Sequence, residues 1–375
     1  MIPYGRQSVD EDDIQAVANV LRSDWLTTGP VISSFEEGIT SFVGARHGIA
    51  VSSGTAALHC AMYALGIGSG DEVIVPPITF ASTANCICFM GGTPVFADVD
   101  PGTLLIDPEQ VECKITKKTK AIIGVDYAGQ PCDWDRLRMI ADRHGLALVA
   151  DGCHALGAEY KAHKAGTLAD MTVFSFHPVK HITTGEGGMI VTNNDEYAAK
   201  MRLFRSHGIT SDARDREKTG AWFYEMVDLG YNYRISDIQC ALGLSQLKKL
   251  PLWLERRRSI ALTYDHFFAE NNLAIPLQVR SDVNHAYHLY VIRTTQRDNI
   301  FPQLRAQGIG VNVHYVPVYM HPFYQKKIGL KKGLCPIAEK AYTEILSLPM
   351  YPGLSSSLQN KVCSVLKNVL PENPL

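Results

Sequence analysis

The sequence predicts an α/β protein with a mostly parallel, doubly wound sheet, followed by a smaller α+β unit. Short β-branched runs recur through the first half of the chain, and helical patterns stand between several of them. Successive parallel strands need crossover connections, which those helices supply. A long helical stretch then separates this half from a tail with fewer strands. We therefore expect a large domain over residues 1–250 and a small C-terminal domain over 251–375.

The first elements alternate between helix and strand. An amphipathic helix is predicted from Asp10 to Leu21 behind a cap at Ser8 or Asp10, and a second from Ser33 to Val43. A short strand, His47–Ser53, then runs into a turn, and a helix opens at Gly54 and continues to Leu65. Strand, turn and helix therefore meet between Ser52 and Thr55.

The other predicted strands of the sheet are β-branched runs bounded by turn residues. They cover 71–77, 93–100, 120–129, 146–155, 170–176 and 187–193. Ligands of such sheets bind at the carboxyl ends of the strands. This rule predicts that Asp151, Ser175 and the turn before Thr55 lie on one rim.

The second half of the chain begins with a polar stretch, Ser206–Glu225, which is typical of a surface excursion. A long or bent helix is predicted from Ile235 to Phe268, with an interruption at Pro251. Strands follow near Tyr287–Thr294 and Val311–Tyr315. The last predicted helix covers 356–370.

Composition excludes several classes of partner. The 375 residues are 46% hydrophobic and 20% charged, as in ordinary globular proteins, and the net charge is −2. No global basic field is available to hold nucleic acid or an anionic membrane. The N-terminus does not resemble a signal peptide, and no apolar run approaches the roughly 20 residues that span a bilayer. We expect a soluble, cytoplasmic protein.

The cysteines and histidines do not show metal-ligand spacing. The 9 Cys are scattered, and the one close pair, Cys86 and Cys88, does not form a CxxC motif. The 13 His include no HExxH pattern. We therefore expect buried thiols of a reducing compartment and no metal site.

Lys180 is the most informative candidate for chemistry. It stands in SFHPVKHITTGEGG, between an apolar strand and a glycine-rich turn, where a backbone can approach a ligand. Partial removal of the amine from water lowers its pKa and makes it nucleophilic. A solvated loop lysine is the competing interpretation. The other polar residues of the predicted rim favour the interpretation that Lys180 is a reactive amine.

Asp151 follows the apolar run LALVA, so its carboxylate ends a buried strand. An unpaired charge there would be costly. The protonated nitrogen of a pyridine ring would pair with it, and such a ring acts as an electron sink in pyridoxal phosphate. A helix cap at a strand-to-helix junction remains the alternative for Asp151.

The turn Ser53-Gly54-Thr55-Ala56 opens a helix directly after a strand. Free N–H groups and the helix dipole at such an N-terminus suit a phosphate dianion. Small-residue turns before helices are nevertheless common, and this turn has neither a Walker lysine nor GxGxxG spacing.

Taken in chain order, these motifs resemble a known family. SSGTAAL, PPITFASTAN, ADGCHALGA, SFHPVKHITTGEGG and GYNYRISDIQCALGLSQL are similar to the DegT/DnrJ/EryC1/StrS sugar aminotransferases, over essentially the whole chain. Within the family, the chain more closely resembles the nucleotide-sugar transaminases of pseudaminic acid biosynthesis. This resemblance is carried by VDYAG, DGCHALGAEY, LFRSHGI, ALGLSQLKK and VHYVPVY. Those enzymes form UDP-4-amino-4,6-dideoxy-N-acetyl-β-L-altrosamine from a 4-keto sugar.

The resemblance implies a fold type I pyridoxal 5'-phosphate (PLP) transferase, with a seven-stranded sheet sandwiched by helices. Pyridoxamine phosphate is the intermediate form of the cofactor in such enzymes. The catalytic residues implied are Lys180, as the Schiff-base lysine, and Asp151, as the partner of the ring nitrogen. The remaining cofactor contacts implied are Gly54, Thr55 and Ser175 for the phosphate, Phe80 stacked on the ring, His154 at the phenolic oxygen or ring face, and Asn232 from a second subunit.

A site completed by two chains implies a homodimer. Core packing is the alternative for Phe80. Many family members have Gln where His154 stands. Relatives that deoxygenate sugars have histidine at the lysine position, so Lys180 favours amino transfer.

For the UDP-sugar, the resemblance points to aromatic and charged residues that could stack on uracil and pair with diphosphate. They are Tyr4, Asp24, Trp25, Leu26, Thr27, Arg234, His314, Tyr315, Val316 and Pro317. Trp25 and Tyr315 could equally be packing residues, and Arg234 part of a structural ion pair.

The resemblance also implies glutamate as the amino donor. A transaminase of another 4-keto or 3-keto nucleotide sugar would have the same fold and catalytic residues, because pocket shape sets the sugar. A non-catalytic relative of the fold would be favoured by loss of Lys180 or Asp151, and both are present. A doubly wound dehydrogenase lacks support, since no GxGxxG turn follows the first strand.

Overall fold

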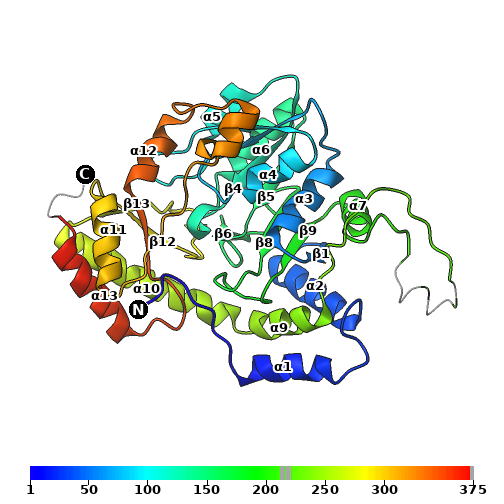
Figure 1. Ribbon diagram of the computed structural model, residues 1–375, viewed down its shortest axis with the longest axis horizontal. Coiled ribbons are helices and arrows are strands. Elements are labelled where there is room, and N and C mark those ends of the chain that lie inside the picture. The colour runs from blue at the N-terminus through cyan, green and yellow to red at the C-terminus, as the bar shows by residue number, and fades with distance from the viewer. Residues whose placement is uncertain (212–215, 217–219, 221, 372–375) are drawn as a thin grey trace.

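The computed structural model describes residues 1–211, 216, 220 and 222–371, and it is built around a seven-stranded sheet (Figure 1). The strand order is β1-β9-β8-β5-β4-β2-β3. Strand β9 runs antiparallel to both neighbours, and the pairs from β8 to β3 are parallel. The strands are β1 (His47–Val51), β2 (Glu72–Val75), β3 (Thr93–Phe96), β4 (Thr119–Val125), β5 (Ala147–Asp151), β8 (Met171–Ser175) and β9 (Gly188–Thr192).

All seven runs predicted as strands are therefore confirmed, as is the mostly parallel sheet. Alternation along the strands sends neighbouring residues to opposite faces. Ile49 and Val51 of β1 join one hydrophobic cluster with helix α3 (Gly54–Ala64), whereas Ala50 between them joins another with helices α2 (Pro30–Val43) and α9 (Asp237–Leu247). Each face of the sheet is buried, which explains the nearly continuous apolar runs.

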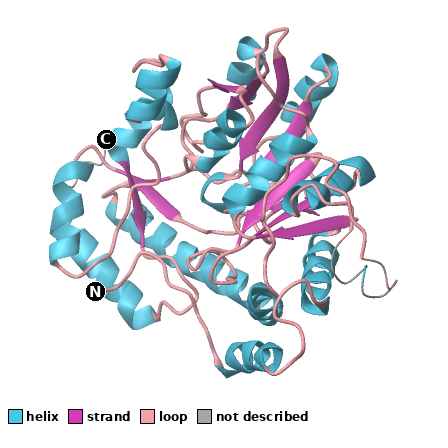
Figure 2. Cartoon of the chain, turned by 45° about the vertical axis from the view of Figure 1, so that its right-hand side comes forward, coloured by secondary structure: helices cyan, strands magenta, loops and turns pink. Residues whose placement is uncertain are grey.

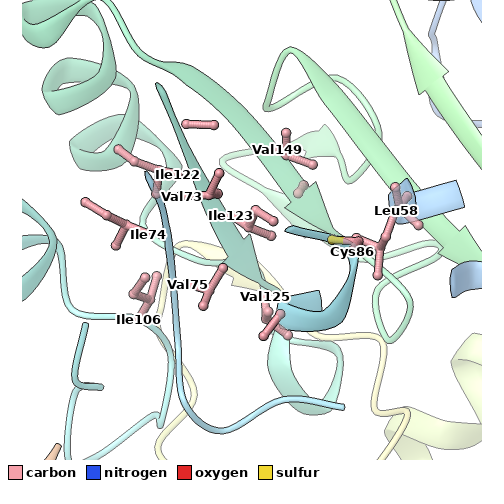
Figure 3. Close-up of a cluster of buried hydrophobic side chains, with 14 of the residues drawn as sticks. Leu58, Val73, Ile74, Val75, Cys86, Ile106, Ile122, Ile123, Val125 and Val149 are labelled. Carbon is pink, nitrogen blue, oxygen red and sulfur yellow. The ribbon is translucent and has the colours of Figure 1, made fainter. Parts of the chain in front are cut away.

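The interior of the parallel part is a dense aliphatic cluster (Figure 3). Val73, Ile74 and Val75 of β2 pack there with Ile122 and Ile123 of β4, and each of these side chains is fully buried. Burial of an aliphatic side chain contributes about 1.5–3 kcal/mol. This rigid frame fixes the strand ends that carry the polar residues of the rim.

Helices and short elements surround the sheet (Figure 2). Of the two predicted caps, Asp10 is the one that caps the first helix, and it forms a reciprocal capping box with Asp13. The helices of this part are α1 (Glu11–Leu21), α2 (Pro30–Val43), α3 (Gly54–Ala64), α4 (Ser82–Phe89), α5 (Pro108–Lys114), α6 (Trp134–His144) and α7 (Asp195–Arg205). A 3-10 turn, η1 (Tyr127–Gly129), follows β4, and β6 (Glu159–Tyr160) pairs with β7 (His163–Lys164) and β11 (Val283–Asn284).

The predicted long helix divides into α9 (Asp237–Leu247) and α10 (Leu250–Asn271). Pro251 lies in the first turn of α10. Backbone N–H groups in a first turn have no acceptor within the helix, so the missing N–H of proline costs no hydrogen bond there. The start of α10 packs with the large sheet through Leu250 and Leu254, and its later residues join the C-terminal cluster. Helix α10 thus begins at the predicted boundary at residue 250 and contacts both parts of the chain.

The C-terminal part contains a three-stranded sheet in the order β10-β12-β13. Its elements are β10 (Ile275–Pro276), β12 (Tyr290–Arg293), α11 (Arg297–Ala306), η2 (Val318–Met320), η3 (Tyr324–Ile328), α12 (Pro336–Glu344), β13 (Ile345–Leu348) and α13 (Ser356–Val369). Strand β12 and helix α13 confirm two predicted elements.

The strand predicted over Val311–Tyr315 is wrong. Asn312 forms an isolated bridge with Ser347, and the chain then leaves the sheet. The third strand of this sheet is β13, which the sequence analysis did not identify. Departure from the sheet allows His314 and Tyr315 to reach the cavity described below.

The N-terminal segment lies against the C-terminal part rather than beside the large sheet. The N–H of Ile2 donates to the carbonyl of Gly308, and the N–H of Gly310 donates to Ile2. The carbonyl of Tyr4 accepts from Met350. These bonds hold Tyr4 near the boundary between the two parts of the chain.

The predicted excursion at 206–225 lies partly outside the described residues. Its described flanks pair as an antiparallel arm, through bridges between Ser206 and Asn232 and between Ile209 and Met226 (Figure 1). Within the described part of the chain, no helix combines the length and apolar character needed to cross a lipid bilayer.

Candidate active site

Three elements converge on one cavity of about 780 Å³. Asp151 ends β5, Ser175 ends the neighbouring parallel strand β8, and Thr55 lies in the first turn of α3. Lys180 stands in the loop between β8 and β9, held in a turn by the bond from its N–H to the His177 carbonyl. The predicted rim is therefore formed, and Lys180 and Asp151 line the same cavity.

Asp151 is 5% exposed and has two hydrogen-bond donors of its own chain. Thr83 Oγ1 donates to Oδ2 at 2.7 Å, and the Cys153 N–H donates to Oδ1 at 3.2 Å. Thr79 in turn lies 2.8 Å from Thr83, hydroxyl to hydroxyl. These bonds fix the carboxylate and leave capacity for another donor from the cavity.

The Lys180 amine is partly withdrawn from water. Burial lowers its pKa, and the nearby Cys153 and Asp151 oppose that shift. A lower pKa increases the fraction of free amine at neutral pH, which is the form that attacks a carbonyl carbon and accepts protons.

The N-terminus of α3 opens onto the cavity. Ser53 caps the helix by accepting from the Ala56 N–H at 3.1 Å. A Cβ at Gly54 would lie 3.0 Å from the Ser175 Cβ, and one at Gly188 of β9 would lie 2.4 Å from the Ser53 carbonyl oxygen. Glycine at both positions therefore lets strand and helix backbones approach closely beside the free N–H groups.

A group of aromatic side chains forms another wall. The Tyr315 hydroxyl lies 3.2 Å from Nε2 of His154, and the His288 ring packs on His154 with 4.3 Å between centroids. Burial and the positive charge of Lys180 hold the pKa of His154 well below its usual range. Burial also lowers the pKa of His314 to about 3. These imidazoles are therefore neutral at neutral pH.

Phe80 and Tyr4 lie at the edge of the cavity. The Phe80 side chain is 60% exposed, which is incompatible with core packing. Its ring meets Tyr315 edge-on at 6.2 Å. Tyr4 packs against His314 at 5.3 Å between ring centroids.

The structure brings together ten predicted site residues around this cavity. They are Tyr4, Gly54, Thr55, Phe80, Asp151, His154, Ser175, Lys180, His314 and Tyr315. The others do not line it within one chain: Asp24, Trp25, Leu26, Thr27, Asn232, Arg234, Val316 and Pro317. Thr27 bridges Ser236, two residues after Arg234, so these two predicted segments lie together although neither lines the cavity.

Several lining residues were missed by the sequence analysis. Glu186 belongs to the lysine motif, and its position there was a usable signal. Thr79 likewise lies in the PPITFASTAN motif, next to Phe80, whereas His288 and Asn312 come from segments without a recognisable motif. Only the packing of the C-terminal part against the rim places His288 and Asn312 in the cavity.

The chemistry of these side chains fits PLP. Asp151 offers a fixed carboxylate to a cationic ring nitrogen, Lys180 an amine to an aldehyde, and the α3 N-terminus free N–H groups to a phosphate. The exposed Phe80 ring provides a stacking surface. Among the described residues, no group of three or more His, Cys, Asp and Glu side chains could hold a metal ion.

Comparison with known proteins gives matches over nearly the whole chain. A sequence model of the DegT/DnrJ/EryC1/StrS aminotransferase family matches residues 7–367. The chain is 41% identical to the spore coat polysaccharide biosynthesis protein SpsC of Bacillus subtilis (strain 168), covering 98% of this chain and 97% of that protein.

Two solved structures share the fold over nearly their whole lengths. The putative sugar aminotransferase Spr1654 of Streptococcus pneumoniae, in its PMP form, superposes with a TM-score of 0.93 at 33% identity, covering 98% of this chain and 99% of the other. A PLP form of the same protein is also similar. PseC of Helicobacter pylori, an aminotransferase of pseudaminic acid biosynthesis, superposes with a TM-score of 0.92 at 36% identity, with the same coverage.

Proposed function

The chain belongs to the DegT/DnrJ/EryC1/StrS aminotransferase family, and on that premise we propose that it transfers the amino group of L-glutamate to a UDP-linked sugar. It is a PLP-dependent sugar aminotransferase. The proposed acceptor is the C4 ketone of a 4-keto-6-deoxy-N-acetylhexosamine. The product would be UDP-4-amino-4,6-dideoxy-N-acetyl-β-L-altrosamine.

The observation that carries this proposal is the presence of Lys180 and Asp151 in one cavity. When bound, PLP supplies an aldehyde and an electron-withdrawing ring. Lys180 would hold the cofactor and, once free, move a proton at the carbon that exchanges its nitrogen. Asp151, fixed by Thr83, would keep the ring nitrogen protonated, and Gly54, Thr55 and Ser175 would hold the phosphate.

The walls of the cavity support binding of a polar, ring-shaped substrate. Phe80 would stack on the cofactor ring, and His154 would contact its phenolic oxygen or its face. Tyr4, His314 and Tyr315 supply hydrogen-bonding groups on the C-terminal side. The similarity to PseC supports a sugar of the pseudaminic acid pathway.

A transaminase acting on another nucleotide 4-keto or 3-keto sugar is the second candidate. The similarity to SpsC, whose name refers to spore coat polysaccharide, favours it to a comparable degree. The chemistry at Lys180 would be identical, because the sugar is selected by the shape of the pocket.

Incubation of the purified, PLP-loaded protein with glutamate and a panel of UDP-4-keto sugars separates the candidates. The panel contains both configurations at C5, and NMR reads the product. We expect amination of the L-configured ketone in preference to its epimer. Exclusive amination of the D-configured sugar would contradict the proposed substrate, and amination of neither would contradict the UDP-sugar proposal.

We further propose a homodimer with shared sites in the cytoplasm. Asn232 is exposed and lies outside its own chain's cavity, at the base of the arm. That arm carries exposed apolar side chains, of which Trp222 is 83% exposed. A second subunit would cover such a surface and receive Asn232 at its phosphate. The nine free thiols fit a reducing compartment.

A further inference from the structure

Tyr315 and His154 share a hydrogen bond whose direction determines what the cavity presents to a ligand. Their hydroxyl and Nε2 atoms are 3.2 Å apart, and either can be the donor. If Tyr315 donates to His154, its hydroxyl proton is already used, and the phenolic oxygen can only accept a hydrogen bond from a ligand in the cavity. If His154 donates to Tyr315, the phenolic O–H is free to serve the cavity.

The surroundings of His154 select one of these arrangements. The ring is neutral, because burial and Lys180 hold its pKa well below the usual range, and a neutral imidazole has a single N–H. Its Nδ1 is buried and, among the described residues, has no hydrogen-bond partner. The ring of His288 packs over it at 4.3 Å, and the Nδ1 of His288 also lacks a partner there.

Placement of the proton on Nδ1 of His154 would bury an N–H without an acceptor. Such a group loses the hydrogen bond that it makes in water, and orphaned buried N–H groups are rarer than unsatisfied acceptors. Placement on Nε2 satisfies the N–H through the Tyr315 oxygen and leaves only a lone pair at Nδ1. The second arrangement is therefore the more stable one.

We propose that Tyr315, with its oxygen accepting from His154, directs its O–H into the cavity as the hydrogen-bond donor to the ketone oxygen of the sugar. This inference rests on the proposed function. Burial keeps the phenol protonated by raising the pKa of Tyr315 well above its usual value. The side chain lines the same cavity as Lys180, where the proposed sugar would bind.

The chemistry of the ketone explains what such a donor does. Exchange of oxygen for nitrogen breaks the C=O bond, forms a bond to nitrogen, and releases the oxygen as water with both hydrogens of the incoming amine. A donor at the ketone oxygen stabilises the negative charge that develops there during attack. Tyr315 retains its own proton at the end of the step.

The tautomer of His154 can be tested without any sugar. Holoenzyme labelled with ¹⁵N-histidine gives an imidazole pattern for each tautomer, and loss of one signal in His154→Gln assigns the residue. We expect Nε2 protonated and Nδ1 bare across neutral pH. An Nδ1-protonated His154 would overturn the inference whatever substrate the enzyme accepts.

The role of the Tyr315 hydroxyl can be tested by separating the two halves of the reaction. In Tyr315→Phe, we expect the reaction with the keto sugar to slow by about 100-fold and the reaction with glutamate to stay within about threefold of the wild type. Rapid-mixing absorbance of the cofactor measures both. Tyr319→Phe is the control, since Tyr319 is buried, bonds Glu339 and does not line the cavity.

The outcomes distinguish this inference from the proposed function. Equal slowing of both half-reactions, or of neither, would show that Tyr315 does not act at the ketone. The sugar half-reaction is measured with whichever keto sugar the wild type aminates. A wild type that aminates none contradicts the proposed function, whereas an Nδ1-protonated His154 in an enzyme that aminates a keto sugar contradicts the present inference alone.

Discussion

Single residues in this protein derive their chemistry from burial. The Lys180 amine would be a protonated surface group in water, and burial in the cavity lowers its pKa. Asp151 retains a defined position because Thr83 and the Cys153 backbone N–H donate to it. Reactivity at this scale therefore depends on neighbours from β5, α4 and the loop after β8.

We expect Lys180→Ala to lose at least about 1,000-fold in turnover, because both the tether and the proton carrier are removed. The absorption band of the lysine-bound cofactor should also disappear. Steady-state kinetics and a visible spectrum measure the two effects. Lys161→Ala is the matched control, since Lys161 is exposed and pairs with Asp135 at the surface. Normal transamination by Lys180→Ala would refute the assignment.

Asp126 gives a prediction for stability rather than catalysis. It is 1% exposed, and Oδ1 accepts from the Cys132 N–H and the Trp134 indole. Burial raises its pKa to about 7, with a further contribution from Asp151. The folded protein thus binds this proton more tightly than the unfolded chain does. The stabilisation is complete below about pH 4 and is lost as the pH rises through about 7.

The contribution of Asp126 to the free energy of unfolding therefore changes by about 4 kcal/mol across that pH window. Asp126→Asn should remove this dependence, so its unfolding free energy should fall less between pH 4 and pH 8 than that of the wild type. Urea unfolding at several pH values measures it. Asp12→Asn, at an exposed position of α1, should behave like the wild type. Parallel pH profiles for wild type and Asp126→Asn would contradict the raised pKa.

At the scale of elements, the proposed phosphate-binding end of the cavity depends on how closely β9 approaches α3. Gly188 starts β9, and the Cβ of any other residue would lie 2.4–2.8 Å from backbone atoms of Ser53 and Gly54. Backbone cannot move aside as a flexible side chain can. The close approach therefore fixes the N-terminus of α3 beside Ser175.

Gly188→Ala should consequently displace the α3 N-terminus and weaken PLP binding by about tenfold or more, with a loss of about 1–3 kcal/mol in stability. Fluorescence titration of the apoprotein with PLP and thermal unfolding measure the two effects. Gly68→Ala is the control, because a Cβ at Gly68 would meet no atom within 4 Å. Unchanged PLP affinity in Gly188→Ala would show that the α3 N-terminus does not hold the phosphate.

At the scale of the whole molecule, the proposed dimer makes each site depend on two chains. Lys180 lies in the cavity, whereas Asn232 lies outside it at the base of the arm. If Asn232 enters the partner's site, Lys180→Ala and Asn232→Asp remove different halves of one site. A mixed dimer of the two variants then keeps one intact site.

We expect each variant alone to be inactive and their co-refolded mixture to recover about one quarter of wild-type turnover. Turnover of the mixture against each parent measures this, with analytical ultracentrifugation to follow assembly. A mixture of Lys180→Ala and Asp151→Asn is the control, because these two residues line the same cavity of one chain and cannot complement each other in this way. Absence of recovery in the first mixture, with dimers present, would contradict the shared site.

Much of the fold could be predicted from local patterns. The β-branched runs identified all seven strands of the large sheet, and the cap at Asp10 and the break near Pro251 were also confirmed. The segment at 311–315 was misassigned, because an apolar run does not reveal whether a neighbouring strand continues beside it. There Asn312 forms only an isolated bridge with Ser347 of β13, and β13 pairs along its length with β12 instead.

By itself, the sequence determined the parallel sheet and the membership of the family, and it predicted that the chemistry depends on Lys180 and Asp151. Only the tertiary structure decided that His288 and Asn312 enter the cavity, and that the Asp24–Thr27 stretch and Arg234 remain outside it in one chain. Local patterns record backbone conformation and the periodicity of burial. The set of side chains that share a cavity depends on how elements distant in the chain pack together.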